Sequence, residues 1–536
     1  MKKGRWILEL LFNGRILTME GGVRASAILT HEGRILAVGE SEALAGKAGA
    51  DCRRTDLRGA AVLPGFIDGH SHLVQFANSL RFVSLAGCTS FSQIQEALAQ
   101  RLMPGKPSAE DWIVGFGYDH NRLDEAGHPD RFTLDEVSSV RPILISHASG
   151  HMGCANSAAL SAAGIGPGTP DPDGGRIGRH HDGTPSGYLE ENAFMALAAV
   201  VPQPSREQML RHLDEAQKRY LSYGVTTAQE GLMKQPEFEL LDDAAERGRL
   251  KLDVVGYADI RDSASLLRQH PDRFSYRARF RLGGYKLFLD GSPQGRTAWL
   301  TAPYLPSGDQ DETYCGYPIY TDEQVRAFVA AAASEGRQLL THCNGDAAID
   351  QLLSAYEAPS LHRDVVIHAQ LMRRGQLPRL RELGLMPSYF VAHTWYWGDT
   401  HLRNLGTDRA KRISPLASTA ALGIPFTLHQ DTPVLPPDML QTVWCAARRI
   451  TSGGVLLADD ERISPEAALQ AITLWGARQY SEEDTKGSLV PGKRADLVIL
   501  DRDPTAVPTD EIPAISILAT VKDGEAVYRR PPHPAN

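Results

Sequence analysis

The sequence predicts an α/β protein of the (β/α)8 TIM-barrel class, with a small β-sandwich built from both termini and an inserted subdomain. Three observations predict this architecture: eight strand-like apolar runs, helical segments that alternate with the later runs, and polar residues where the runs end. With 536 residues, the chain exceeds what one hydrophobic core usually holds, so a large domain with satellites is expected.

The barrel prediction depends on segments that alternate between strand and helix. A capping box of Ser205 and Gln208 opens one helix. A second capping box, of Thr321 and Gln324, opens another helix, which Gly336 ends. A doubly wound open sheet is the structural alternative, but no G-x-G-x-x-G motif follows the first strand candidate. The strand candidates are residues 62–68, 224–228, 251–257, 282–289, 338–342, 364–368, 385–390 and 425–430.

Short apolar runs separated by tight turns occupy both ends of the chain. Asn13-Gly14 and Asp523-Gly524 predict β-hairpins, and Glu32-Gly33 provides another tight turn. Because the two ends share this pattern, residues 1–61 and 487–536 are predicted to fold together into one β-sandwich.

The intervening chain divides into three predicted parts. Residues 62–75 hold the first barrel strand, residues 205–486 hold the remainder of the barrel, and residues 76–204 form an inserted α/β subdomain or lid. Regular patterning fades in this insertion. Its Gly-, Pro- and His-rich stretch from Asp171 to Gly187 is too long for a plain connection.

The composition is that of an ordinary soluble protein, with 42% hydrophobic and 23% charged residues and a net charge of −9. No run of Lys and Arg forms a basic stripe, so no nucleic-acid partner is expected. The six cysteines show no C-x-x-C spacing, which predicts a reducing compartment, the cytoplasm, without disulfides. Glu9 interrupts the only signal-like start, and no run is long enough to span a membrane.

The stretch V-L-P-G-F-I-D-G-H-S-H ends the first strand candidate with His70 and His72, which share one face of an extended chain. Catalytic zinc sites need at least three protein ligands. Later strand ends supply further candidates, namely Lys286, His342, His368 and Asp431. A single histidine is more often a hydrogen-bonded core or surface residue. Because several independent strand ends agree, and barrel strand ends converge, a shared metal site is predicted.

Lys286 requires its own argument, since a protonated ammonium repels a metal ion. Strand alternation places it on the same face as Phe288 and Asp290, pointing into the barrel, where burial and nearby cations lower the pKa of an amine. A neutral amine can add carbon dioxide, and the resulting carbamate can bridge two divalent ions. The alternative is a buried lysine paired with Asp290.

The chain resembles the amidohydrolase superfamily in five blocks: P-G-F-I-D-G-H-S-H, K-L-F-L-D-G-S-P-Q-G-R-T-A, T-H-C-N-G-D-A-A-I-D, V-I-H-A-Q and the late aspartate. More narrowly, it resembles amidohydrolase family 3, the branch that contains N-substituted formamide deformylases. The resemblance implies a distorted barrel and a metal-dependent hydrolase, most plausibly with two zinc ions. It assigns as ligands His70, His72, carboxylated Lys286 as the bridge, His342, His368 and Asp431.

One departure from the family pattern is visible before the late aspartate. Many members have Gly-Ser there, whereas this chain has His429-Gln430. Thr427, His429 and Asp431 share one strand face, so His429 is predicted either to support the ligands or to reshape the substrate site.

The ligand set predicts the chemistry. Bound metal lowers the pKa of water towards ~7, and Asp431 would take the water proton and deliver it to the leaving nitrogen. Hydrolysis of an amide or formamide bond in a small molecule is the leading hypothesis. The alternatives are an aminohydrolase of a heterocyclic ring and a metal-containing protein that binds a ligand without turnover. Lys286 favours the first, because ring deaminases of the superfamily commonly use a mononuclear site without this lysine.

Candidate substrate residues come from three regions. The insertion offers His151, Asn156 and Glu190, the fourth strand block offers Asp290 and Arg296, and the segment after the seventh strand offers His393, Trp395, Trp397 and His401, with His429 beyond it. Aromatic walls there would suit an organic substrate. Loop packing or a subunit contact, as in a homodimer, explains the tryptophans equally well.

Overall fold

The computed structural model describes residues 8–49, 51–102, 112–147, 151–306 and 312–531. The chain forms two compact units, one of Met1–Phe76 with Asp214–Asn536 and the other of Ala77–Leu213. Each unit has its own sheets and its own hydrophobic core.

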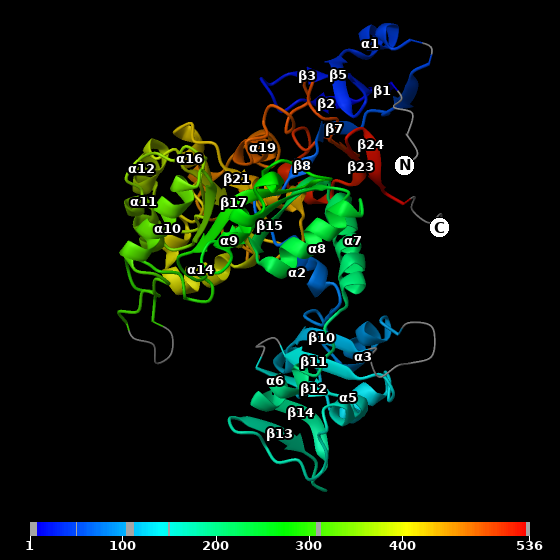
Figure 1. The fold of residues 1–536 in the computed structure, drawn as a ribbon, viewed down its shortest axis with the longest axis vertical. Helices are drawn as coiled ribbons and strands as arrows, with labels where there is room; N and C mark the ends of the chain where they lie inside the picture. Colours follow the sequence, from blue (N-terminus) through cyan, green and yellow to red (C-terminus); the bar gives the residue numbers. More distant parts are fainter. Residues whose placement is uncertain (1–7, 50, 103–111, 148–150, 307–311, 532–536) are drawn as a thin grey trace. The chain divides into compact units, whose positions relative to one another are not determined.

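The centre of the first unit is a sheet of eight strands, all paired in parallel. Helices on its outside include α8 (Gln235–Glu246), which packs on β15 and β17, and α9 (Ala264–Gln269), which packs on β16 and β17 (Figure 1). The sheet curls, and the result is a TIM-like α/β fold. Its strands are β8 (Phe66–Ile67), β15 (Val225–Met233), β16 (Asp253–Asp259), β17 (Phe280–Phe288), β18 (Gln338–Cys343), β19 (Val365–His368), β20 (Met386–Tyr389) and β21 (Thr427–Leu428).

The first and last strands of this sheet approach each other at Gly69. A Cβ atom on Gly69 would lie 2.7 Å from Oγ1 of Thr427, so only glycine fits. Gln479 joins the two ends, because its Nε2 donates to the Gly69 carbonyl (2.7 Å) and its Oε1 accepts from Thr427 (2.6 Å). This approach brings the residues that follow β8 and β21 into one place.

The predicted first strand, residues 62–68, is two strands in different sheets. β7 (Ala61–Pro64) pairs with β2 (Arg15–Leu17) and β22 (Leu497–Leu500), whereas β8 pairs with β15. The break has a local cause: Pro64 ends one strand, and a Cβ on Gly65 would lie 2.4 Å from the Thr226 side chain. The prediction of one continuous strand is therefore wrong.

Two further sheets of the first unit involve the chain ends, where blue and red strands lie together in Figure 1. The Glu32-Gly33 and Asp523-Gly524 turns are confirmed, since each joins a pair of antiparallel strands. The Asn13-Gly14 hairpin is wrong, because β1 pairs with β4 and β6 while β2 pairs with β3 and β7. One sheet has the order β24-β23-β22-β7-β2-β3 and the other β5-β4-β1-β6. The β-sandwich stays a prediction.

The strands of these two sheets are β1 (Glu9–Phe12), β2 (Arg15–Leu17), β3 (Arg24–Ala25), β4 (Ala27–His31), β5 (Arg34–Gly39), β6 (Arg53–Asp56), β22 (Leu497–Leu500), β23 (Ile517–Lys522) and β24 (Glu525–Arg529). Helices elsewhere in the first unit are α1 (Ser41–Lys47), α10 (Asp322–Ser334), α11 (Asp346–Ala355), α12 (Leu377–Glu382), α13 (His393–Tyr396), α14 (Gly398–Leu405), α15 (Thr407–Ala410), α16 (Leu416–Ala421), α17 (Met439–Arg448), α18 (Pro465–Ala471) and α19 (Leu474–Gln479). The residues of two helices, α2 (Leu73–Ser79) and α7 (Arg206–Ser222), are divided between the two units.

Both predicted capping boxes are confirmed. Ser205 Oγ accepts from the Gln208 amide and Gln208 Oε1 accepts from the Ser205 amide, at the start of α7. Thr321 and Gln324 make the same reciprocal pair at the start of α10.

A buried ion network links the eight-stranded sheet to a terminal sheet. Asp253 on β16 accepts from Nζ of Lys486 at 2.6 Å and from Nζ of Lys522, on β23, at 2.9 Å. Lys522 also contacts Asp496 at 2.7 Å. Only 2% or less of the Asp253, Lys486 and Lys522 side chains is exposed.

The second unit is built on a six-stranded sheet of order β13-β14-β12-β11-β10-β9. The stretch from Asp171 to Gly187, predicted to be too long for a plain connection, contains β13 and an antiparallel turn into β14. At Gly175 in β13, a Cβ atom would lie 2.4 Å from the Ala193 amide nitrogen, so glycine permits this close approach. The elements are β9 (Val83–Ser84), β10 (Ile113–Tyr118), β11 (Ile143–His147), β12 (Met152–Ala155), β13 (Gly175–Arg179) and β14 (Pro185–Glu191), with α3 (Phe91–Ala99), α4 (Arg131–Asp135), α5 (Ser157–Ala162) and α6 (Asn192–Ala198). In the described ranges of both units, no helix is long and apolar enough to cross a membrane.

Candidate metal centre

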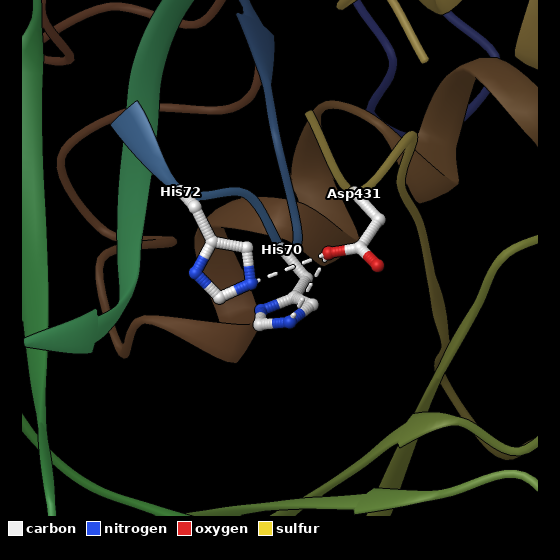
Figure 2. Close-up of side chains that lie close together, drawn as sticks. All are labelled: His70, His72 and Asp431. Carbon is white, nitrogen blue, oxygen red and sulfur yellow. Dashed lines mark ion pairs between the residues drawn. The ribbon is translucent and has the colours of Figure 1, made fainter. Parts of the chain in front are cut away.

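His70, His72 and Asp431 meet where β8 and β21 end (Figure 2). Nε2 of His72 lies 3.4 Å and Nε2 of His70 lies 3.6 Å from Oδ1 of Asp431. The exposed fraction of the side chain is 1% for His70, 13% for His72 and 15% for Asp431. Two imidazole nitrogens and a carboxylate oxygen at this spacing form a donor set that zinc accepts.

The Asp431 carboxylate supports this interpretation. Among the described residues, its buried Oδ1 has no close hydrogen-bond partner, and its nearest contact is Nε2 of His72 at 3.4 Å. A buried oxygen without a good partner is costly. Burial by itself would raise the pKa of Asp431, but the neighbouring His72, His368 and His70 imidazoles hold that pKa well below its usual range. The carboxylate is therefore ionised and faces two ring nitrogens, which fits a cation placed among the three groups.

A fixed hydrogen-bond network orients His70. Nε2 of Gln229 donates to the Gly69 carbonyl (3.2 Å) and to the Tyr480 hydroxyl (3.0 Å), so Oε1 of Gln229 faces Nδ1 of His70 at 2.5 Å. An amide oxygen only accepts, so we place the proton of His70 on Nδ1. Nε2 then carries the lone pair that a metal ligand requires, and it lies 2.9 Å from Nζ of Lys286 and 3.6 Å from Oδ1 of Asp431.

Lys286 is fully buried on β17, and its Nζ lies 2.9 Å from Nε2 of His70. Burial lowers the pKa of Lys286 to about 7, against the opposing effect of Asp431. Among the described residues no Lys286–Asp290 pair forms. Asp290 instead accepts from the backbone amides of Asn344, Gly345 and Trp299, and so fixes the loops that follow β17 and β18.

His342 and His368 form a second pair of imidazoles beside the first. Nε2 of His342 donates to the Gly291 carbonyl at 3.1 Å, which leaves its Nδ1 facing Nε2 of His368 at 3.0 Å. Nε2 of His368 also lies 4.0 Å from Oδ2 of Asp431. His368 and Asp431 both have positive φ values, 69° and 52°, a strained backbone that is common where side chains are held for function.

His429, the departure from the family pattern, adds a third ring to the row of contacting imidazoles formed by His342 and His368, called the histidine chain below. Its Nε2 lies 3.2 Å from Nδ1 of His368, and its Nδ1 lies 2.8 Å from the Ser388 hydroxyl. Burial lowers the pKa of His429 to about 3, so the ring is neutral. The contact between Nε2 of His429 and Nδ1 of His368 orients the His368 ring, as the contact of Gln229 orients the His70 ring.

Two contributors to this site did not emerge from the sequence. Gln229 orients His70, and Glu230 lies with Oε1 3.9 Å from Nδ1 of His72 while Oε2 accepts from the Val74 amide. The second strand was predicted to end at residue 228, whereas β15 continues to Met233. Two adjacent polar residues, Gln-Glu, after an apolar run were the available signal.

The aromatic segment after β20 lies beside the histidine chain. The Phe390 ring contacts His429 with centroids 5.3 Å apart and His393 with centroids 4.7 Å apart. His393 is buried, with Nδ1 3.0 Å from Nε2 of His401. His393 therefore belongs to the wall around the candidate centre.

The tryptophans and Arg296 make mainly packing contacts. Trp395 packs edge-on against Trp444 at 5.0 Å, and Trp397 packs against His393 at 4.6 Å. Nη2 of Arg296 donates to the Leu305 carbonyl at 2.6 Å. These contacts favour the loop-packing interpretation of Trp395.

The remaining predicted substrate residues lie in the second unit. Asn156 is buried, caps α5 and binds backbone around β11, which is a structural role. Oε1 of Glu190 accepts from the Tyr188 hydroxyl at 2.8 Å, and Nδ1 of His151 lies 3.1 Å from the Glu191 carboxylate. Their role in substrate binding stays a prediction.

Two relatives are similar to the chain over nearly its whole length. It is 28% identical to the N-substituted formamide deformylase of Arthrobacter pascens, over 97% of this chain and 98% of the relative. It is 29% identical to the putative amidohydrolase YtcJ of Bacillus subtilis (strain 168), over 96% of this chain and 98% of the relative.

A solved structure extends this similarity to the fold. The crystal structure of an uncharacterized metal-dependent hydrolase from Pyrococcus furiosus matches 93% of this chain and 100% of its own, with a TM-score of 0.73 and 26% identity. The amidohydrolase family model matches residues 54–528, which include every residue of the candidate centre. The chain belongs to the amidohydrolase family.

Proposed function

We propose that this protein hydrolyses an amide or formamide C–N bond of a small molecule, with a divalent metal centre and Asp431 as the proton shuttle. Family membership supports metal-dependent hydrolysis of C–N bonds in general. The observation that carries the finer proposal is the buried Oδ1 of Asp431, which has no close hydrogen-bond partner and faces the ring nitrogens of His70 and His72.

The residues fit two adjacent divalent ions of the zinc class. His70, His72 and Asp431 offer one set of donors, His342 and His368 offer a second, and Lys286 stands beside the first. When bound, such ions polarise a substrate carbonyl and lower the pKa of water.

Lys286 serves this centre as a carbamate. Its neutral amine would attack the carbon of carbon dioxide, so that an N–C bond forms while one C=O π bond opens and leaves its electron pair on oxygen, and the nitrogen would lose a proton to solvent. The anionic product has two oxygens and suits a bridge between cations. Burial in contact with His70, rather than pairing with Asp290, supports this role.

Asp431 moves the proton in the reaction. Its ionised carboxylate has Oδ1 directed at His70 and His72 and Oδ2 on the side of His368. It accepts a proton from the attacking water and delivers that proton to the nitrogen that leaves. Gln229 contacts the His70 ring and His429 contacts the His368 ring, and these contacts hold the two rings in their orientations meanwhile.

The amide or formamide preference is tested with chelator-treated and zinc-reconstituted protein. N-formyl amines, N-acyl amines, lactams and ring amines are offered, and formate, released amine and ammonia are measured. Zinc-dependent release of formate or carboxylate from an acyl amine is expected. Ammonia from ring amines alone would favour the aminohydrolase, and no turnover of any class at full metal content would favour a binding protein. A homodimer and a cytoplasmic location stay predictions from the sequence.

A further inference from the structure

A second cluster of metal-binding side chains lies in the second unit, on the edge where β10 and β11 end. Asp119 and His120 directly follow β10 (Ile113–Tyr118), and His147 is the last residue of β11 (Ile143–His147). β10 and β11 are parallel neighbours, so their carboxyl ends bring these three side chains together.

The ligand atoms of the three residues converge. Nε2 of His147 lies 3.2 Å from Nδ1 of His120 and 3.5 Å from Oδ1 of Asp119, and Nδ1 of His120 lies 4.0 Å from the same oxygen. Tetrahedral zinc with bonds of ~2.0–2.2 Å to N and O separates its ligand atoms by roughly 3.3–3.6 Å. The three observed separations, 3.2, 3.5 and 4.0 Å, are close to these ligand–ligand distances.

The longest side of the triangle is not a hydrogen bond. Nδ1 of His120 and Oδ1 of Asp119 lie 4.0 Å apart, which is too long for a hydrogen bond but within the reach of two ligands of one ion.

Neighbouring rings hold the cluster in shape. The His128 ring stacks on His120 with centroids 4.2 Å apart and planes at 28°, and Nδ1 of His128 lies 2.9 Å from the Tyr118 hydroxyl. Tyr118 is buried and its ring packs edge-on against His147 at 5.4 Å. The imidazoles that supply the donor atoms are thus braced on both sides.

We infer that Asp119, His120 and His147 form a second metal site, which binds a zinc-class divalent ion. This site shares no residue with the centre at His70 and Asp431. Two imidazoles and one carboxylate favour zinc, cobalt or nickel over magnesium and calcium, which prefer all-oxygen sites. The Asp119 and His120 side chains are 34% and 31% exposed, so an ion there has a coordination position open to solvent.

The test counts metal by site in the full-length protein. Chelator-treated wild type is dialysed against zinc, and against magnesium as the contrast, and bound metal is measured by mass spectrometry. The double variant His120→Ala/His147→Ala should bind one zinc equivalent fewer than the wild type. His181→Ala, an exposed histidine of the same unit outside the cluster, should match the wild type. Circular dichroism checks folding, and His147→Gln is the milder substitution.

The companion variant His70→Ala/His72→Ala separates this inference from the proposed function. It should lose metal at the first centre and keep the equivalent held by Asp119, His120 and His147. Crystals soaked in zinc should give an anomalous peak among these three side chains. Unchanged zinc content in His120→Ala/His147→Ala, or anomalous peaks confined to His70, His72 and Asp431, would overturn the second site and leave the proposed function standing.

Discussion

Nζ of Lys286 lies 2.9 Å from Nε2 of His70, the same ring nitrogen that faces Oδ1 of Asp431. Two parallel-sheet strands thus place an amine of lowered pKa beside an oriented imidazole. This relationship is what the carbamate requires, because only the neutral amine reacts with carbon dioxide.

Lys286→Ala should therefore remove a ligand without disturbing the barrel. Bound metal should fall below the wild-type amount and turnover should drop with it, while added acetate or propionate should restore part of both by occupying the vacated space. Lys286→Met, which fills the space without a reactive nitrogen, should not respond to added acid. Metal content and turnover that stay at the wild-type level in Lys286→Ala would exclude the bridging role.

Asp431→Asn should separate binding from catalysis. The substitution keeps the shape of the side chain and removes its charge and basicity, so turnover should fall by at least the ~10²–10⁴-fold that general acid–base help contributes. Folding should survive, since the hydrophobic core does not depend on one carboxylate at the end of β21. Turnover near the wild-type level, with metal content checked, would rule out Asp431 as the proton shuttle.

The candidate ligands could be predicted from sequence because the fold itself makes strand ends converge. His70, His342 and His368 each follow an apolar run, and parallel strands bring such positions to one edge. Strand boundaries were less predictable: Gly65 divides the expected first strand because of close contact with Thr226, a residue distant in sequence.

A supporting role was one of the two predicted for His429, but the hydrogen bonds of the supporting residues could not be predicted, because their partners are far away in the chain. Tyr480 reaches Gln229 across 251 positions, and Ser388 reaches His429 across 41. No local pattern announces such hydrogen bonds. The same holds for His120 and His147, whose meeting depends on the pairing of β10 with β11 in a region where sequence periodicity is weak.

Gln229→Leu tests whether orientation of His70 matters for metal binding. The leucine fills similar space but leaves Nδ1 of His70 without its acceptor, so metal affinity should fall ~10–100-fold. Gln229→Glu keeps an oxygen acceptor and should stay much closer to the wild type.

Gln217→Leu provides the matched control for that experiment. Gln217 is equally buried, but it binds the backbone of Lys251 and Arg249 instead of a candidate ligand. Its replacement should lower stability without changing metal affinity. Competition with a chelating dye measures the affinity of all three variants, and equal weakening in Gln229→Leu and Gln217→Leu would contradict the orienting role.

The ion network at Asp253 should set how the stability of the first unit depends on pH. Burial by itself would raise the pKa of Asp253, but Lys486, Lys522 and Arg494 hold it far below its ordinary value. A lowered pKa in the folded state means that the stabilisation is present above the unfolded-state pKa of ~3.9 and is lost as pH falls below it. For Lys486, burial is outweighed mainly by Asp253, so its pKa is raised, and its contribution is lost as pH rises above ~10.4.

Asp253→Asn should therefore be strongly destabilising and should flatten this pH dependence. Two buried lysines lose their shared anion, a change that typically costs ~3–5 kcal/mol of unfolding free energy. Glu215→Gln, which breaks the exposed Glu215–Lys218 pair, should cost no more than ~1 kcal/mol. Urea unfolding followed from pH 3 to pH 10.5 measures both variants. If Asp253→Asn loses stability at acid pH as steeply as the wild type does, the acid sensitivity arises from other carboxylates, and the network does not control it.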